Sequence, residues 1–273
     1  MLKCVAVVDG KRIDFEKQPL FLGYKPLVMG VCDVPELIQL LPESKHVTFE
    51  YLNKVSGEKV ASLELRVDKI FPVEDKFLVL LVGISGTQQL ETRLERLAFR
   101  LNEMLTKKPA GNIDLTTSEY DQLKIAYSIP REIRMVSVHH ELGANTFPID
   151  LFGPAGANHL ALSLRHAKKS CAQIVEAKLI TIRIMLSKYA PFAYFIGRCH
   201  SMDWHKATLP PDQIGKEEFE FTKIIGDYGV HRIIILRRIS PMIADSPEKL
   251  VHVHRSYANW CKRQGFPLKE IPH

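Results

Sequence analysis

The sequence predicts an α+β protein in two parts, an N-terminal α+β domain over residues 1–120 and a strand-rich domain over residues 125–273. Short runs of alternating apolar and polar residues recur along most of the chain, which is typical of strands. Leucines at three- and four-residue steps between Thr87 and Leu105 indicate one long amphipathic helix. A segment rich in Lys, Pro, Gly and Asn follows, so we place the domain boundary between residues 107 and 130.

The N-terminal part begins with a hairpin signal, Asp9-Gly10 between two apolar runs. A helix is predicted to start at Asp33, because Pro35 falls in its first turn and Glu36 lies three residues after the cap. The leucine stripe of the long helix is expected to face the protein core rather than a partner helix. No internal repeat is visible in the sequence. Further strands are predicted at residues 27–32, 46–52, 59–70 and 76–84.

Bulk composition is that of an ordinary globular protein, with 46% hydrophobic and 25% charged residues. No apolar run approaches the 18 residues of a membrane span, and the N-terminus lacks the long apolar segment of a signal peptide. The five cysteines are scattered, with no C-x-x-C pair. We therefore expect reduced thiols in a cytoplasmic protein, without a disulfide framework.

The positive charge is concentrated in the second half of the chain. Residues 1–125 carry 17 Lys and Arg against 18 Asp and Glu, whereas residues 126–273 carry 20 against 13 and ten of the eleven histidines. A solvated basic surface is one explanation, and attraction of anionic ligands is the other. Nucleic acid is not favoured, because no basic run is interleaved with aromatic residues.

Residues 135–174 form the most informative segment. Alternating residues from Met135 to Val138 predict a strand that enters a turn at Gly143, and a second strand follows at 145–152. After a Gly/Pro/Asn loop, a third strand is predicted at His159–Leu164. A basic turn, 165–169, then leads into a short helix near Ser170.

This order resembles the flavin reductase-like split barrel, an FMN-binding family in which G-x-x-N-A-x-P-x-S-W-F leads to V-S-L-x-x-x-R-H-T. Here Gly143 precedes N-T-F-P-I-D-L-F, and Ser163-Leu164 precede K-K-S at 168–170. The match covers about 40 residues, and the apolar run 231–239 also resembles the family's late strand. The resemblance implies a C-terminal split β-barrel that binds FMN between the subunits of a homodimer.

The resemblance also implies roles for individual residues. A helix N-terminus with nearby positive charge suits a phosphate, so Lys168 would supply charge and Ser170 a hydroxyl, with Lys169 beside them. Asp150 stands where the family has Ser, and its carboxylate would oppose negative charge on a reduced flavin. The other residues implied to contact the cofactor are Asn145, Thr146, Phe147, Ser163 and His231. The alternative for each is structural: a capped surface helix, a turn asparagine or a packed histidine.

An active protein of this kind would take hydride from NADH or NADPH at flavin N5 and pass electrons to free flavin, oxygen, a metal complex or a partner oxygenase. No side chain is needed as acid or base, so the sequence identifies no catalytic residue. Adjacent His139 and His140 of a strand point to opposite faces, and no metal site is expected. The alternatives are a binding or assembly module that has lost its flavin, or a related barrel that binds haem.

Overall fold

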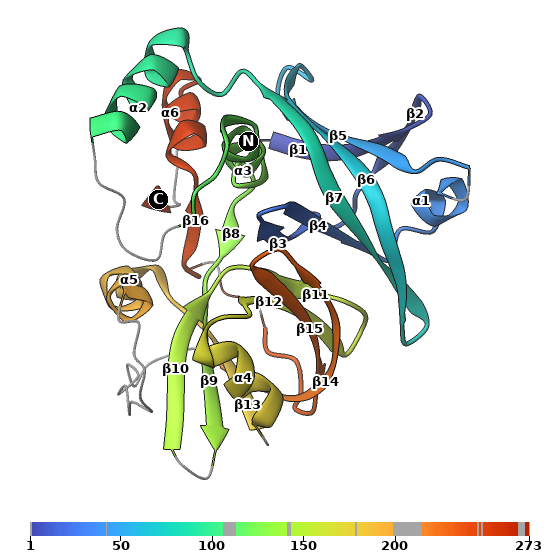
Figure 1. Cartoon of the computed structure of the whole chain (residues 1–273), viewed down its shortest axis with the longest axis vertical. Coiled ribbons are helices and arrows are strands. Elements are labelled where there is room, and N and C mark those ends of the chain that lie inside the picture. The colour runs from blue at the N-terminus through green and yellow to red at the C-terminus, as the bar shows by residue number, and fades with distance from the viewer. Residues whose placement is uncertain are drawn as a thin grey trace.

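The computed structural model describes residues 2–41, 43–105, 113–140, 143–177, 179–198, 215–244, 246, 248–266 and 271–272. It is an α+β structure made mostly of antiparallel sheets with few helices (Figure 1). In these residues no helix combines the length and apolar character needed to cross a membrane. Most of the predicted linker at 107–115 lies outside the described residues. So does Glu141, which follows the adjacent His139 and His140.

The N-terminal sheet contains seven strands in the order β2-β1-β5-β6-β7-β4-β3. Burial alternates along β5, where every second residue is buried, whereas β3 and β4 are buried along nearly their whole length. A short helix, α1 (Pro35–Leu40), connects β4 to β5. The strands are β1 (Leu2–Val8), β2 (Lys11–Asp14), β3 (Leu20–Tyr24), β4 (Leu27–Cys32), β5 (His46–Asn53), β6 (Lys59–Val73) and β7 (Lys76–Gln88).

The C-terminal sheet also contains seven strands, in the order β10-β9-β13-β14-β15-β12-β11. A helix, α4 (Lys169–Glu176), connects β12 to β13 and covers an apolar core. A 3-10 turn (Ser187–Tyr189) and α5 (Ala190–Arg198) follow β13. The strands are β9 (Arg134–His140), β10 (Gly143–Ile149), β11 (Phe152–Pro154), β12 (His159–Arg165), β13 (Leu179–Ile184), β14 (Lys216–Tyr228) and β15 (His231–Arg238).

The two sheets have the same topology. When the strands of each sheet are numbered from one to seven along the chain, both orders read 2-1-5-6-7-4-3. In both, a helix follows the fourth strand. The chain therefore contains a structural repeat that the sequence does not reveal, because the repeat lies in strand pairing rather than in residue identity.

The remaining elements connect and flank the sheets. Helix α3 (Thr117–Ala126) starts with a capping box formed by Thr116 and Glu119, and its residues pack against β7. A third, three-stranded sheet has the order β17-β16-β8. The additional elements are α2 (Arg93–Leu105), β8 (Arg131–Glu132), β16 (Val251–Val253), α6 (Arg255–Arg263) and β17 (Ile271–Pro272).

Two predictions about helices were wrong. Strand β7 extends to Gln88, which pairs with Ala61, so α2 begins only at Arg93. Its leucine stripe does not face the core: Leu94, Leu97 and Leu101 are 77%, 55% and 47% exposed. The reason is that α2 lies at the edge of the molecule beside α6 (Figure 1), where it has no sheet to cover. The N-cap of α1 is Val34, one residue after the predicted Asp33.

An apolar cluster joins the two sheets. It takes buried residues from β3, β4, β6 and β7 of one sheet and from β12, β14, β15 and the loop before β12 of the other. The contact is close, since a β-carbon at Gly153 would lie 2.2 Å from Cδ2 of Leu20. The buried members are Leu20, Leu22, Val28, Val73, Leu78, Leu80, Ala155, Ala161, Ile225, Tyr228, Ile233 and Ile235. The two sheets are therefore packed against each other through a continuous apolar interface.

Candidate functional site

The strand pairings relate individual positions of the two sheets. Both long hairpins end in two-residue turns, and the closing pairs are Val73–Lys76 in one sheet and Tyr228–His231 in the other. Lys76 therefore corresponds to His231. Two residues further on, Leu78 pairs with Cys32, and Ile233 pairs with Ser163. Cys32 of β4 thus corresponds to Ser163 of β12.

The same counting reaches the third strand of each sheet. Gly30 pairs with Leu20, whereas Ala161, its counterpart, pairs with Gly153, so Leu20 corresponds to Gly153. By the same count, Val28 of β4 corresponds to His159 of β12. Gly23 pairs with Val28, and the Ala155 amide donates to the His159 carbonyl, so Gly23 corresponds to Ala155. The next residue is Tyr24 in the N-terminal sheet and Gly156 in the C-terminal sheet. Tyr24 and Gly156 therefore occupy corresponding positions.

These positions define two places where the sheets meet. We call the group Cys32, Lys76 and Gly156 the first corner, and the corresponding group Ser163, His231 and Tyr24 the second corner. Each corner combines residues of both sheets.

The hairpin turns meet reciprocally at the two corners. At the first, the Glu74 carboxylate in the β6–β7 turn accepts hydrogen bonds from the amides of Ala157 and Asn158, at 3.1 and 3.4 Å. At the second, Gly229 in the β14–β15 turn packs against the Lys25 carbonyl in the β3–β4 turn. Reciprocal use of matching surfaces is the property of a two-fold symmetric dimer interface.

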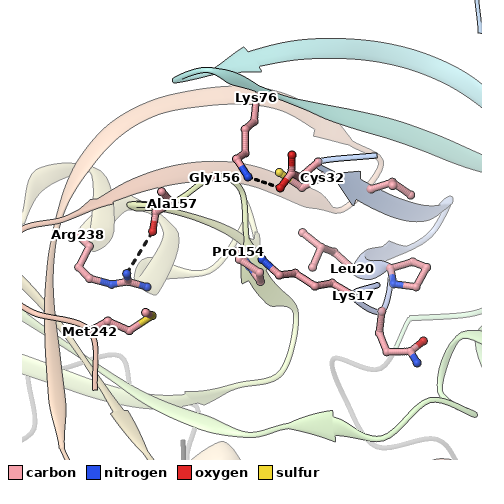
Figure 2. Close-up of a pocket in the computed structure, with 13 residues that line it drawn as sticks. Lys17, Leu20, Cys32, Lys76, Pro154, Gly156, Ala157, Arg238 and Met242 are labelled. Carbon is pink, nitrogen blue, oxygen red and sulfur yellow. Dashed lines mark hydrogen bonds and ion pairs between the residues drawn. The ribbon is translucent and has the colours of Figure 1, made fainter. Parts of the chain in front are cut away.

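The first corner contains a pocket of about 320 Å³. Its walls come from both sheets, and Figure 2 shows the Lys17 side chain extending toward Pro154. Three cationic side chains, those of Lys17, Lys76 and Arg238, line it. The full lining is Lys17, Gln18, Pro19, Leu20, Val31, Cys32, Asp33, Lys76, Pro154, Gly156, Ala157, Arg238 and Met242.

Two of these cations are held by carboxylates. Lys76 pairs with Asp33, and Arg238 Nε lies 2.8 Å from Oε1 of the buried Glu217. Arg238 also donates to the Ala157 carbonyl at 3.3 Å, which fixes its position at the rim (Figure 2). The Lys17 ammonium has no carboxylate partner in the described part of the chain. The pocket therefore offers one uncommitted cation and two anchored ones to an anion.

Cys32 in this pocket is not an activated nucleophile. Burial and the nearby charge of Asp33 raise the pKa of its thiol, and Lys76 and Lys17 only partly oppose this. The thiol is therefore protonated at neutral pH, and thiolate is the reactive form of cysteine. The arrangement suits binding of an anionic ligand rather than covalent chemistry.

The second corner contains the Tyr24 side chain. Its ring centroid lies 4.5 Å from that of His231, at an interplanar angle of 71°. The Tyr24 hydroxyl accepts a hydrogen bond from Arg165 Nε at 3.0 Å and a second one from Nη2 of the same guanidinium. The Ser163 hydroxyl lies 3.3 Å from His231 Nδ1. Burial and the Arg165 charge lower the pKa of His231 to about 4, so the imidazole is neutral at pH 7.

Among the predicted cofactor residues, the structure brings Ser163 and His231 into contact. The other strand residues make separate contacts: the buried Asn145 amide donates to Gln173 of α4 at 2.6 Å, and Thr146 lies 3.0 Å from the Ser137 hydroxyl. Phe147 packs on the core of the C-terminal sheet.

The predicted phosphate-binding residues lie at the start of α4. Lys168 is its N-cap and has no side-chain capping hydrogen bond, while Lys169 and Ser170 are its first two residues. The helix thus begins one residue before Ser170. The role of Lys168, Lys169 and Ser170 in binding a phosphate therefore stays a prediction.

The Asp150 side chain is 21% exposed and belongs to a partly buried network of hydrogen bonds. It accepts a hydrogen bond from the Tyr127 hydroxyl at 2.8 Å and lies 3.0 Å from His252 Nε2. Burial alone would raise its pKa, but the hydrogen bond with His252 and the charges of His252 and Arg131 lower it to about 2. Asp150 is therefore a carboxylate that links β16 and the end of α3 to the C-terminal sheet.

Sequence reasoning does not identify the cations that line the pocket at the first corner. Lys17, Lys76 and Arg238 are far apart in the chain and carry no local motif. In the sequence, the turn containing Gly156 is apparent only as a Gly/Pro/Asn loop. In the residues that the structure describes, no group of three or more His, Cys, Asp or Glu side chains is placed to hold a metal ion.

No family model and no curated protein matches this sequence. Several solved structures have a similar arrangement over about half of the chain. BorF, the flavin reductase component of a bacterial two-component tryptophan halogenase, is 14% identical, and the match covers 48% of this chain and 91% of BorF, with a TM-score of 0.42. The Streptomyces globisporus NADH:FAD oxidoreductase SgcE6 is 10% identical over 52% of this chain and 92% of its own, with a TM-score of 0.43. An FMN-binding protein from Thermus thermophilus is 12% identical over 55% and 93%, also with a TM-score of 0.43.

Proposed function

We propose that this chain is a flavin reductase-like protein in which two split-barrel units, within residues 1–120 and 125–273, form an internal dimer that binds FMN at the first corner. One observation carries the proposal: the pocket between the two sheets is lined by both of them and contains three cationic side chains. The internal dimer replaces the homodimer expected from the sequence, because a single chain supplies both sides of the site.

The residues of the pocket fit a flavin nucleotide. Lys17, Lys76 and Arg238 suit its phosphate, which prefers several charged donors. A side chain at Gly156 would strain the backbone, because its φ is 133°, and the β-carbon would lie 3.1 Å from Glu74 Oε2. Apolar surface for a ring comes from Leu20, Pro154 and Met242. A volume of about 320 Å³ lies at the lower end of the range for ligand pockets, about 300–1,000 Å³.

Bound FMN would accept hydride from NADH or NADPH and pass electrons to free flavin, oxygen or a partner oxygenase. In this proposal the protein's side chains bind and orient the cofactor. The cations of the pocket offset the phosphate charge, and the apolar interface behind Leu20 excludes water from one side. Protonated Cys32 takes no part in hydride transfer.

Titration of the purified protein with FMN tests the proposal. Flavin fluorescence should be quenched with a stoichiometry of one per chain, and NADH or NADPH should bleach the bound flavin. Lys17→Ala and Lys76→Ala should each weaken FMN about tenfold at low salt, as expected for a charge-assisted contact of about 1.5 kcal/mol. The loss should shrink as ionic strength rises. Lys11→Ala on exposed β2 is the matched control and should have no effect.

Riboflavin, which lacks the phosphate, should be indifferent to the pocket lysines. Lys168→Ala and Ser170→Ala test the site that the sequence resemblance implied, because only binding near α4 would respond to them. If Lys168→Ala weakens FMN and Lys76→Ala does not, the flavin belongs at the second corner. Absence of quenching at high protein concentration would contradict flavin binding altogether.

A second candidate function is a binding or assembly module without flavin. It is favoured by the second corner, where the Tyr24 ring packs against His231, a residue that the resemblance assigned to the cofactor, and the Tyr24 hydroxyl binds Arg165. The absorbance spectrum of the purified protein, before and after incubation with FMN or haemin, separates the functions. Flavin bands support the first candidate, a Soret band indicates haem, and neither indicates the module.

A further inference from the structure

Of the three pairs of corresponding residues at the two corners, Gly156 and Tyr24 differ most in the size of the side chain. Gly156 contributes only backbone to the first corner, which contains the pocket of about 320 Å³. The corresponding residue at the second corner is Tyr24, and its ring lies against His231. A tyrosine in place of a glycine fills the space that the other corner leaves open.

The contacts of Tyr24 resemble those of a ligand. Its hydroxyl accepts hydrogen bonds from two nitrogens of the Arg165 guanidinium. Arginine commonly presents this forked pair of donors to a phosphate or carboxylate. The guanidinium carbon also lies 5.8 Å from the centre of the Tyr24 ring. A neutral phenol oxygen therefore occupies the place where Arg165 could bind an anion.

A second observation at this corner is independent of Arg165. His231 is 2% exposed, and its Nε2 atom has no hydrogen-bond partner in the described part of the chain. Buried polar atoms of native proteins are nearly always paired, so an unpaired one calls for an explanation. Its other nitrogen, Nδ1, lies 3.3 Å from the Ser163 hydroxyl. The centroids of the Tyr24 and His231 rings are 4.5 Å apart, so a polar group in place of the Tyr24 ring would lie close to the imidazole.

We propose that the second corner is a latent binding site for a phosphate-bearing ligand, closed in this chain by Tyr24, so that the internal dimer has one open site instead of two. The charge of the site would come from Arg165, and a hydrogen-bonding group from His231. Nearby, His166 Nε2 lies 3.0 Å from the Gly229 carbonyl, and Arg232 is paired with Asp227. The proposed function enters only through the identity of the ligand, which we take to be FMN.

Counting the sites by isothermal titration calorimetry tests this inference. The unmodified chain should bind one FMN, and Tyr24→Gly, which copies the residue of the first corner, should bind two. Tyr24→Phe is the matched control: it keeps the ring and loses only the hydroxyl, so it should still bind one. Adding Arg165→Ala to Tyr24→Gly should weaken the new site at least tenfold and leave the first unchanged, whereas adding Lys76→Ala should weaken only the first.

The same variants titrated with inorganic pyrophosphate separate this inference from the proposed function. If the unmodified chain binds no FMN, but Tyr24→Gly gains a pyrophosphate site that Arg165→Ala removes, the latent site stands and flavin binding fails. Tyr24→Ala provides a second variant with a less flexible backbone, and thermal unfolding monitored by circular dichroism confirms that either variant is folded. A folded Tyr24→Gly or Tyr24→Ala chain that gains no site for FMN or pyrophosphate would overturn the inference.

Discussion

A β-carbon at Gly229 would lie 1.8 Å from the carbonyl oxygen of Lys25, so the β14–β15 turn meets the β3–β4 turn backbone to backbone. Gly229 also has a φ of 56°, in the left-handed region that glycine adopts without steric cost. This contact joins the two halves of the chain at the second corner, beside the contacts of Tyr24 with Arg165 and His231. Its counterpart at the first corner is polar, the Glu74 carboxylate on two amides.

We expect Gly229→Ala to lower the free energy of unfolding by about 2–5 kcal/mol. About 1–2 kcal/mol comes from the left-handed backbone, and about 1–3 kcal/mol comes from overpacking against Lys25. Gly57→Ala is the matched control, because Gly57 has a φ of 73° and a β-carbon added there would meet nothing within 4 Å. Urea unfolding of both variants measures the difference, and equal losses would show that the turn contact contributes nothing.

His231 should make stability depend on pH. Its pKa is lowered to about 4 in the folded state from 6.5, so between these values the unfolded chain binds the extra proton. The contribution of neutral His231 to the free energy of unfolding is therefore complete above pH 6.5 and is lost as the pH falls toward 4. Each pKa unit corresponds to about 1.4 kcal/mol, which sets a total of about 3 kcal/mol at most. The unmodified chain should be less stable at pH 4.5 than at pH 7.5. In His231→Gln, the difference between the unfolding free energies at these two pH values should be smaller.

Asp150 should also make the protein less stable as the pH falls. Here the folded state favours the charged form of the side chain, whereas at His231 it favours the neutral form. Its pKa is lowered to about 2 from 3.8, so its contribution is present above pH 3.8 and is lost as the pH falls toward 2. Asp150→Asn should cost about 2 kcal/mol at pH 7, and much less at pH 2.5. Asp75→Asn in the exposed β6–β7 turn provides the control. A penalty that stays constant with pH would mean that lost hydrogen-bond geometry, and not charge, causes it.

The buried ion pair of Lys124 and Glu91, 2.9 Å apart, should behave as a unit. Their side chains are 4% and 6% exposed, and the Ser256 hydroxyl donates to the same carboxylate at 2.5 Å. Lys124→Met leaves a buried charge without its cation and should cost about 3–5 kcal/mol. Replacing both, Lys124→Met with Glu91→Leu, should recover most of that loss. A double variant as unstable as the single one would contradict the expected coupling.

The exposed leucines of α2 can be compared with Leu90, which lies three residues before this helix and is buried. Leu90→Ala removes a fully buried side chain and should cost about 2–5 kcal/mol. Leu97→Ala, at a position 55% exposed, should change stability by no more than about 0.5 kcal/mol. Thermal unfolding of the two variants measures the contrast. A large loss for Leu97→Ala would restore the sequence expectation that this stripe packs on a core.

Many local elements follow from the sequence alone. The Asp9-Gly10 turn pairs β1 with β2 as predicted, and the alternation in His46–Asn53 forms a strand with one buried face. These features are local because turn chemistry and side-chain alternation act within a few residues. The order of strand, basic turn and helix between His159 and Glu176 likewise follows from the local pattern.

The place where a ligand could bind depends instead on tertiary packing. Lys17, Lys76 and Arg238 come together because two sheets of one strand order pack face to face, and no local pattern encodes that contact. The same packing places Tyr24 in one corner and leaves the other open at Gly156. Their correspondence follows from strand pairing, which relates residues far apart in the sequence, so it is visible only when both hydrogen-bond registers are known.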